Sequence, residues 1–262
     1  MHLALAPGKL VLLLLLIAVA MLMSRIRRYG LERDLLEGTI RTFVQLFIVG
    51  FVLNALFQAN HWYWTILMLM LMVVIASQNA ARRGRGIPRI FLWTTLAIAC
   101  GAILTLSLLL VLTIIQWTPR YVIPVGGMII GNSMIASGLV LNRFLEDLKI
   151  KREWVETYLS LGATPEVAIK QVLSPAVKGG MIPTVDSMKT VGLVTLPGMM
   201  TGAILAGANP VNAVELQIMV MLVLAMAVMV TSTMLGSILA RIAFTRSQQL
   251  IAMEDGKYAT GY

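Results

Sequence analysis

The chain has 262 residues, of which 58% are hydrophobic and only 13% charged, and its mean hydropathy is +0.85. In soluble domains charged residues make up roughly a quarter of the sequence, so a soluble fold is excluded and an all-α polytopic membrane protein is predicted. One cysteine (Cys100) and two distant histidines (His2 and His61) exclude a disulfide framework and a cysteine or histidine metal cluster. The net charge is +9, but the basic residues flank apolar segments, so we expect contact with membrane lipid and no nucleic-acid binding.

Seven apolar segments have about the length that crosses a bilayer, which is roughly 20 residues. They are residues 10–23, 38–57, 62–81, 90–117, 121–141, 191–208 and 211–240. Glycines are expected to interrupt the fifth segment, and the sixth is short. In the first, Ala18 and Ala20 resemble a signal-peptidase site, but the positive charges follow the apolar run instead of preceding it. An uncleaved first span is therefore expected.

Basic residues follow every second segment, which predicts the orientation of the chain. They gather after the first, third, fifth and seventh segments, at Arg25, Arg27, Arg28, Arg33, Arg82, Arg83, Arg85, Arg89, Arg143, Lys149, Lys151, Arg152, Lys170, Lys178, Arg241 and Arg246. The other side offers only Lys9 and Arg120. We therefore predict one transmembrane domain over residues 1–262, with the N-terminus outside, the C-terminus in the cytoplasm and a loosely ordered tail over 246–262.

The longest polar stretch, residues 142–189, is too short for a core of its own but is patterned as two cytoplasmic helices. Gly162 predicts a left-handed end of the first helix. The second begins with three residues typical of a helix N-terminus, Thr164, Pro165 and Glu166. Pro175 is expected to follow its end. Such an amphipathic helix could lie under the bilayer or insert into the groove of a partner protein and couple the two.

The spacing of Glu156, Gly162 and Pro175 favours the coupling interpretation. It resembles the cytoplasmic loop of ABC-importer permeases, in which the sequence E-A-A is followed by a glycine and then by L-P. Thr157 and Tyr158 stand where that loop has alanines, and other departures are Val172 and Ser174. On this resemblance, the residues expected to couple the chain to an ATPase are Glu156, Gly162, Thr164, Pro165, Glu166 and Pro175.

A second resemblance covers essentially the whole chain. It rests on YVIP at 121–124, GMIIGNSM at 127–134, LGA at 161–163, PTVDSMKTVGLVTLPGMMTG at 183–202 and AGANP at 206–210. These runs are similar to the FetB-type ABC permease family, which includes plant aluminium-tolerance half-transporters. The resemblance implies a permease in the bacterial inner membrane that acts as a homodimer with a separate ATPase subunit. It also implies export of a metal cation, iron first, and a role in oxidative-stress tolerance.

The energy source has to lie outside the chain. The sequence contains no G-x-x-x-x-G-K-[ST] loop, so ATP is expected on the partner subunit, with no cofactor on this chain and no enzymatic activity. One alternative is a gradient-driven transporter or channel that acts without an ATPase. Another is an intramembrane enzyme or scaffold, although no Ser–His, Asp–Asp or His-x-x-x-His arrangement supplies an enzyme's chemistry.

Polar and helix-breaking residues inside the spans are candidates for the translocation path or its gate, because burying polar groups in lipid is costly. They are Arg41, Gln45, Asn132, Ser133, Asp186, Lys189, Pro197 and Gly198. Each has a structural alternative: snorkelling for Arg41, tight helix packing for Asn132 and Ser133, an ion pair for Asp186 with Lys189, and a packing bend at Pro197. Metal ligands are not identified. The thioethers of Met128, Met134, Met199 and Met200 could serve a soft metal, but methionine is commonly a core filler.

Overall fold

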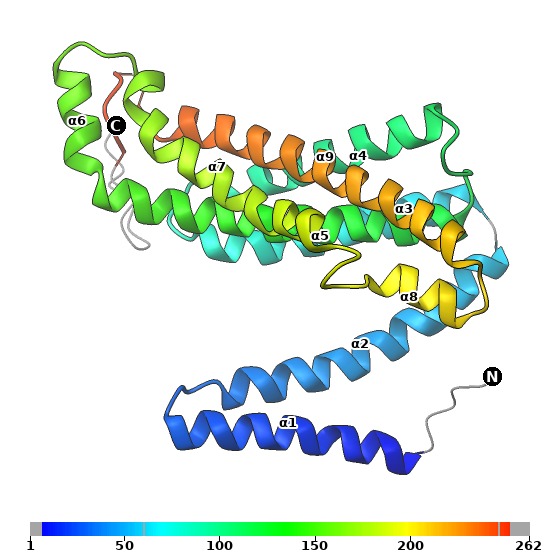
Figure 1. Cartoon of the computed structure of the whole chain (residues 1–262). Helices are drawn as coiled ribbons and strands as arrows, with labels where there is room; N and C mark the ends of the chain where they lie inside the picture. Colours follow the sequence, from blue (N-terminus) through cyan, green and yellow to red (C-terminus); the bar gives the residue numbers. More distant parts are fainter. Residues whose placement is uncertain (1–6, 60, 246, 252–262) are drawn as a thin grey trace. The chain divides into compact units, whose positions relative to one another are not determined.

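The computed structural model describes residues 7–59, 61–245 and 247–251, and nearly all of them are helical (Figure 1). The chain divides into two compact units, residues 1–60 and 61–262. Helices satisfy their backbone hydrogen bonds internally, which a lipid environment requires. Within the described residues, five helices are long and apolar enough to cross a membrane: α2 (Glu32–Ala59), α3 (Trp62–Ala81), α4 (Ile90–Val111), α5 (Pro119–Ile150) and α9 (Pro210–Ile242). The predicted helical membrane fold is confirmed, whereas the span count and the orientation stay predictions.

The first unit is a pair of helices, α1 (Pro7–Arg27) and α2, which contact each other. Ser24 fixes the connection between them, because its hydroxyl donates to Glu32 Oε1 (3.0 Å) and accepts from the Leu31 N–H (3.1 Å). The large side chains of α2, such as Phe47 and Phe51, are mostly exposed. This pattern suits helices that face lipid. The predicted spans 10–23 and 38–57 fall inside α1 and α2, although the side chains of residues 7–14 lie outside the description.

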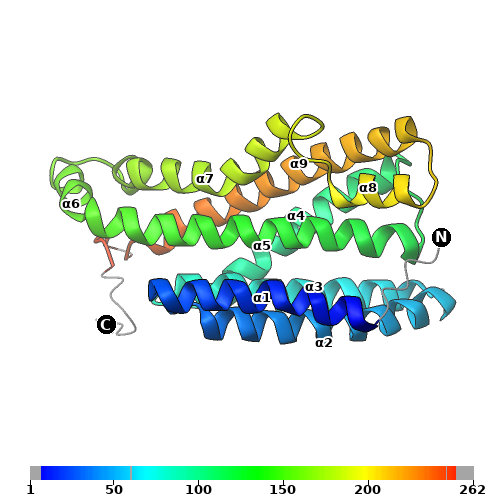
Figure 2. The ribbon, with the colours of Figure 1, turned by 60° about the horizontal axis from the view of Figure 1, so that its bottom comes forward.

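The second unit is a bundle organised around α5, which contacts α3, α4, α9 and α7 (Pro165–Thr190). Fully buried side chains such as Ile98, Ile129, Phe144 and Leu235 fill the spaces between these helices. A short 3-10 turn, η1 (Arg82–Gly84), follows α3 and also contacts α5. Figures 1 and 2 show α7 running beside α5 and α9 along much of their length.

Two of the predicted spans have different ends in the structure. The fourth, expected over 90–117, ends at Val111, and α5 starts at Pro119 with proline in the first turn, where no N–H is needed. The predicted interruption of the fifth span is wrong, because α5 is helical throughout and continues to Ile150. Some of its glycines serve packing instead: the space beside Gly126 is taken by Leu69 of α3, whereas Gly131 borders open space.

The prediction for the sixth span, residues 191–208, is also wrong. Residues 191–197 form turns, and α8 (Gly198–Leu205) has eight residues. At 1.5 Å per residue α8 is only about 12 Å long, too short to cross a membrane. The preceding helix α7 instead continues through Pro175 and Pro183 to Thr190. Helices α7 and α8 both contact α9, so together they form one broken segment along it.

Helix α7 passes through Pro175 because another side chain replaces the hydrogen bond that proline cannot make. Pro175 has no N–H, so the carbonyl of Gln171 loses its helical donor. The ammonium of Lys151 donates to that carbonyl oxygen at 3.0 Å. Lys151 also lies 3.8 Å from the buried carboxylate of Asp147, which Arg143 approaches at 3.4 Å. The predicted helix end before Pro175 is therefore replaced by a compensated proline inside a 26-residue helix.

Only residues 247–251 of the predicted tail 246–262 are described. They fold back on the end of α9: the Ile251 N–H donates to the Ala243 carbonyl at 2.8 Å, and the Thr245 N–H donates to the Gln249 carbonyl at 2.9 Å. The expectation of a loose tail over 252–262 concerns residues outside the description.

Candidate functional site

The predicted coupling segment forms a corner at one end of the bundle, where α5 meets α6 (Arg152–Ser160) and α6 meets α7 (Figure 1). Helix α6 buries Val155 against a cluster that includes Ala168, Ile169 and Val172 of α7. Residues 142–189 are thus no separate element: they comprise the end of α5, all of α6 and nearly all of α7. The corner is tied to the membrane helices by apolar packing and by Lys151.

Gly162 ends α6 in the way the sequence predicts. Its φ is +86°, in the left-handed region that favours glycine. The Gly162 N–H donates to the Leu159 carbonyl and the Ala163 N–H to the Tyr158 carbonyl, both at 3.0 Å. These two bonds make a Schellman motif, which turns the chain sharply after α6. No described atom lies within 4 Å of the position that a Cβ of residue 162 would take, so the turn is open on its outer side.

The start of α7 also follows the prediction in its backbone. Thr164 is the N-cap, Pro165 the first helical residue and Glu166 in the first turn, although within the described structure the Thr164 side chain makes no capping hydrogen bond. The three residues border a groove of about 660 Å³ between the start of α7 and the end of α9. Its other lining residues are Ile169, Leu173, Ser237, Ala240, Arg241, Phe244, Thr245 and Gln248.

The outer surface of the corner combines charge with exposed apolar side chains. Glu156 accepts a hydrogen bond from Arg152 at 2.9 Å, and both side chains are about half exposed. Leu161 is 80% exposed and Trp154 is 61% exposed, with Trp154 stacked on Tyr158. Large exposed apolar side chains gathered in this way are typical of a contact with another protein or with the membrane surface.

Two path candidates on α5 are engaged in helix packing. Ser133 is fully buried and accepts a hydrogen bond from the Thr231 hydroxyl of α9 at 3.2 Å. The Asn132 amide donates to the Met128 carbonyl of its own helix at 2.9 Å. The interhelical contact favours the structural interpretation of Ser133, whereas the bond of Asn132 lies within α5 and leaves both of its interpretations open. In the first unit, Arg41 pairs with Glu37 at 2.6 Å one turn away, and Gln45 is exposed on α2.

The other four path candidates lie around the break in the sixth segment. Asp186 and Lys189 are 4.0 Å apart, but they occupy the last turn of α7 and not the cytoplasmic start of a span. Pro197 is the N-cap of α8, and Gly198 is its first residue. The break itself, residues 191–197, is a tight turn in which the Val194 N–H donates to the Thr190 carbonyl at 2.9 Å.

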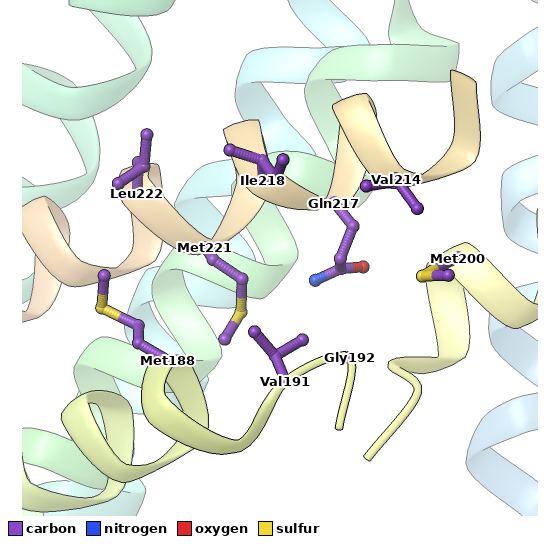
Figure 3. Close-up of a pocket in the computed structure, with 9 residues that line it drawn as sticks. All are labelled: Met188, Val191, Gly192, Met200, Val214, Gln217, Ile218, Met221 and Leu222. Carbon is purple, nitrogen blue, oxygen red and sulfur yellow. The ribbon is translucent and has the colours of Figure 1, made fainter. Parts of the chain in front are cut away.

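A cavity of about 360 Å³ lies at this break, between the end of α7, α8 and the first part of α9 (Figure 3). Gln217 is 5% exposed, and in the described structure its Oε1 has no hydrogen-bond partner. Three methionines from three helices also line the cavity: Met200 on the side of Gln217, Met221 one turn further along α9, and Met188 at the end near Leu222. Of Gln217 and these three methionines, only Met200 is among the sequence candidates. Applying the rule for intramembrane polar residues to the seventh span would have found Gln217.

Comparison with known proteins identifies the family. The family model described as "Uncharacterised protein family (UPF0014)" matches residues 7–244. The chain belongs to the UPF0014 membrane protein family. The similarity to the FetB-type permeases seen in the sequence is thereby confirmed.

Three UPF0014 relatives cover most of the chain. UPF0014 membrane protein YjkA of Bacillus subtilis is 41% identical over 91% of this chain and 96% of its own length. The probable iron export permease protein FetB of Escherichia coli is 42% identical over 80% of this chain and 82% of its own length. Protein ALUMINUM SENSITIVE 3 of Arabidopsis thaliana is 38% identical over 90% of this chain and 87% of its own length. No solved structure matches the chain.

Proposed function

We propose that this UPF0014 protein is the membrane subunit of an ABC transporter that exports a metal cation, iron first, from the cytoplasm across the bacterial inner membrane. Two copies of the chain would form the path, and two copies of a separate ATPase subunit would supply the energy. The cargo is proposed from the E. coli relative, which is 42% identical and is called a probable iron export permease. A homodimer suits a membrane path that is built from repeated units around one axis.

The single structural observation that supports this proposal is the α6–α7 corner. It is exposed on its outer face, fixed to α5 through Lys151, and continuous with a helix of 26 residues. A helix of that length extends about 39 Å at 1.5 Å per residue. Closure of the ATPase dimer against the corner would therefore displace the whole of α7, including its far end beside the break. Glu156, Gly162, Thr164, Pro165, Glu166 and Pro175 are proposed to form or hold this coupling surface.

Metal flux in sealed vesicles tests the function directly. Inside-out vesicles that contain the chain and its ATPase subunit should accumulate Fe²⁺ when ATP is supplied, and vesicles with a hydrolysis-defective ATPase should not. Flux by the chain alone would support the gradient-driven alternative and contradict the proposal. Absence of flux for every metal tested would refute metal export.

A further inference from the structure

The last turn of α7 exposes charge at a depth where its neighbour α9 is apolar. The Asp186 side chain is 63% exposed and the Lys189 side chain 71% exposed, with Ser187 exposed between them. Helices α7 and α9 are antiparallel, since Val177 lies beside Gly236 while Met188 shares the cavity with residues of the first part of α9. These α9 residues include Ile218 and Met221, which belong to the apolar stretch 216–240. The charged turn therefore lies beside the first part of the apolar stretch of α9.

Contact of lipid with the exposed face of α7 at Asp186, Ser187 and Lys189 is energetically unfavourable. A Lys or Asp at the centre of a membrane helix costs about 2.5–3.5 kcal/mol on insertion scales. Non-helical backbone at membrane depth, such as residues 191–197, is tolerated only where protein or water covers it. Helix α7 is long enough to span, yet among the described helices it is not one of the five with spanning hydropathy. The polar composition of the exposed face of α7 is typical of a helix face in contact with water.

We propose that this face lines an aqueous path between two copies of the chain, and that the Gln217 cavity is a transient binding site for a transition-metal cation. The inference rests on the proposed function and names where its cargo binds. It combines two independent observations, the charged turn beside broken backbone and the buried amide oxygen without a partner.

The ligand chemistry of the cavity indicates the class of cation. Thioether sulfur is a soft ligand that suits Cu⁺ and softer transition metals, whereas Mg²⁺ and Ca²⁺ take oxygen ligands. The amide oxygen of Gln217 adds one harder ligand, and the C-terminal end of α7 contributes partial negative charge beside Val191. The side chains of Gln217 and of the methionines that line the cavity are neutral, and among the described residues no group of three or more Asp, Glu, His or Cys forms a metal site. Weak binding of this kind suits a site that must release its ion.

Cysteine labelling tests the aqueous face without any metal. In a Cys100→Ser background, Ser187→Cys should react with a membrane-impermeant methanethiosulfonate reagent in sealed vesicles that contain the transporter. The matched control is Leu216→Cys on α9, since Leu216 is 45% exposed, is next to Gln217 in the chain and does not line the cavity. We expect full modification of S187C and none of L216C. Protection of both would show that lipid or protein covers the face and would overturn the proposal.

Flux variants test the ligand site. Gln217→Leu and Met221→Leu keep the side-chain volume nearly unchanged, and each should lower ATP-dependent Fe²⁺ flux about tenfold, equivalent to about 1.4 kcal/mol. Met219→Leu is the control, because Met219 packs into the neighbouring apolar core and not the cavity. Excess Mg²⁺ should not compete. Unchanged flux in Q217L and M221L would refute the site while leaving the proposed function intact, whereas no flux in the unaltered transporter would refute the function itself.

Discussion

Replacing Lys151 with methionine removes the hydrogen bond that compensates Pro175 in α7. The ammonium donates to the Gln171 carbonyl oxygen at 3.0 Å and lies 3.8 Å from the buried Asp147 carboxylate. A hydrogen bond with a charged partner contributes about 1.5–3 kcal/mol, and exposed ion pairs contribute about 0–1 kcal/mol. The Lys151 side chain is 34% exposed, so water replaces part of this interaction. We therefore expect Lys151→Met to destabilise the corner by about 1–2 kcal/mol.

Hydrogen exchange measures this local effect. Amides of α6 and of the first turns of α7 should exchange about 5–30 times faster in Lys151→Met, as a loss of 1–2 kcal/mol implies. Lys170→Met is the matched control, because Lys170 is exposed on α7 and its side chain makes no hydrogen bond or ion pair in the described part of the chain. Exchange rates at the corner should stay unchanged in that variant.

A double-mutant cycle isolates the compensation of the proline. Pro175→Ala restores an N–H that can bond the Gln171 carbonyl, so in that background the Lys151 substitution should cost less, with a coupling energy of at least about 0.5 kcal/mol. If the two effects add to within about 0.3 kcal/mol, Lys151 does not compensate Pro175 and our account of why α7 continues is incorrect.

Three further substitutions test the corner and the bundle. Gly162→Val forces a side chain into the left-handed region at a cost of about 1–2 kcal/mol, so ions exported per ATP should fall, while Gly131→Ala in open space on α5 should keep that ratio. Glu156→Gln removes an exposed ion pair worth less than about 1 kcal/mol, so the melting temperature should hold while the ions-per-ATP ratio drops; an unaltered ratio would argue against ATPase contact at Glu156. Gly180→Val should lower the free energy of unfolding by about 1–3 kcal/mol, because a Cβ there would lie 2.6 Å from a Val140 methyl. Gly179→Ala, with its nearest neighbour at 3.8 Å, should unfold like the unaltered chain in the same denaturant titration.

The sequence predicts the apolar spans well, because length and hydropathy are local properties. Helix α3 has the predicted bounds, Trp62–Ala81, and α4 and α9 begin at or within one residue of the predicted starts. The same local rules fail at α7. Its prolines and charges indicate a helix end and a polar loop, whereas the donor that rescues Pro175 is Lys151, distant in sequence. The end of α7 was therefore mispredicted because its continuation depends on a tertiary contact.

In the candidate site, too, the sequence predicts the features that depend on local residues and misses those that depend on distant contacts. The turn at Gly162 and the helix start at Thr164 are short motifs whose backbone needs no distant partner, and both were predictable. The cavity was not, because it forms only where α7, α8 and α9 meet, although Gln217 itself could have been singled out as a polar residue inside a span. Ser133 shows the converse, since a polar residue inside a span can also join two helices, as its hydrogen bond with Thr231 of α9 does, and the path roles of Asn132 and Ser133 stay predictions.

The composition of α7 has a consequence for biogenesis. A helix that carries Lys170, Lys178, Asp186 and Lys189 is too polar to partition into the bilayer from the translocon by itself. Its buried residues, such as Ile169 and Ala176, face α5 and α9, so the helix can enter the membrane only together with those neighbours. We expect α7 to stay outside the hydrocarbon region until α9 has been synthesised. The charged residues of α7 thus make membrane insertion of this segment a late step in the assembly of the protein.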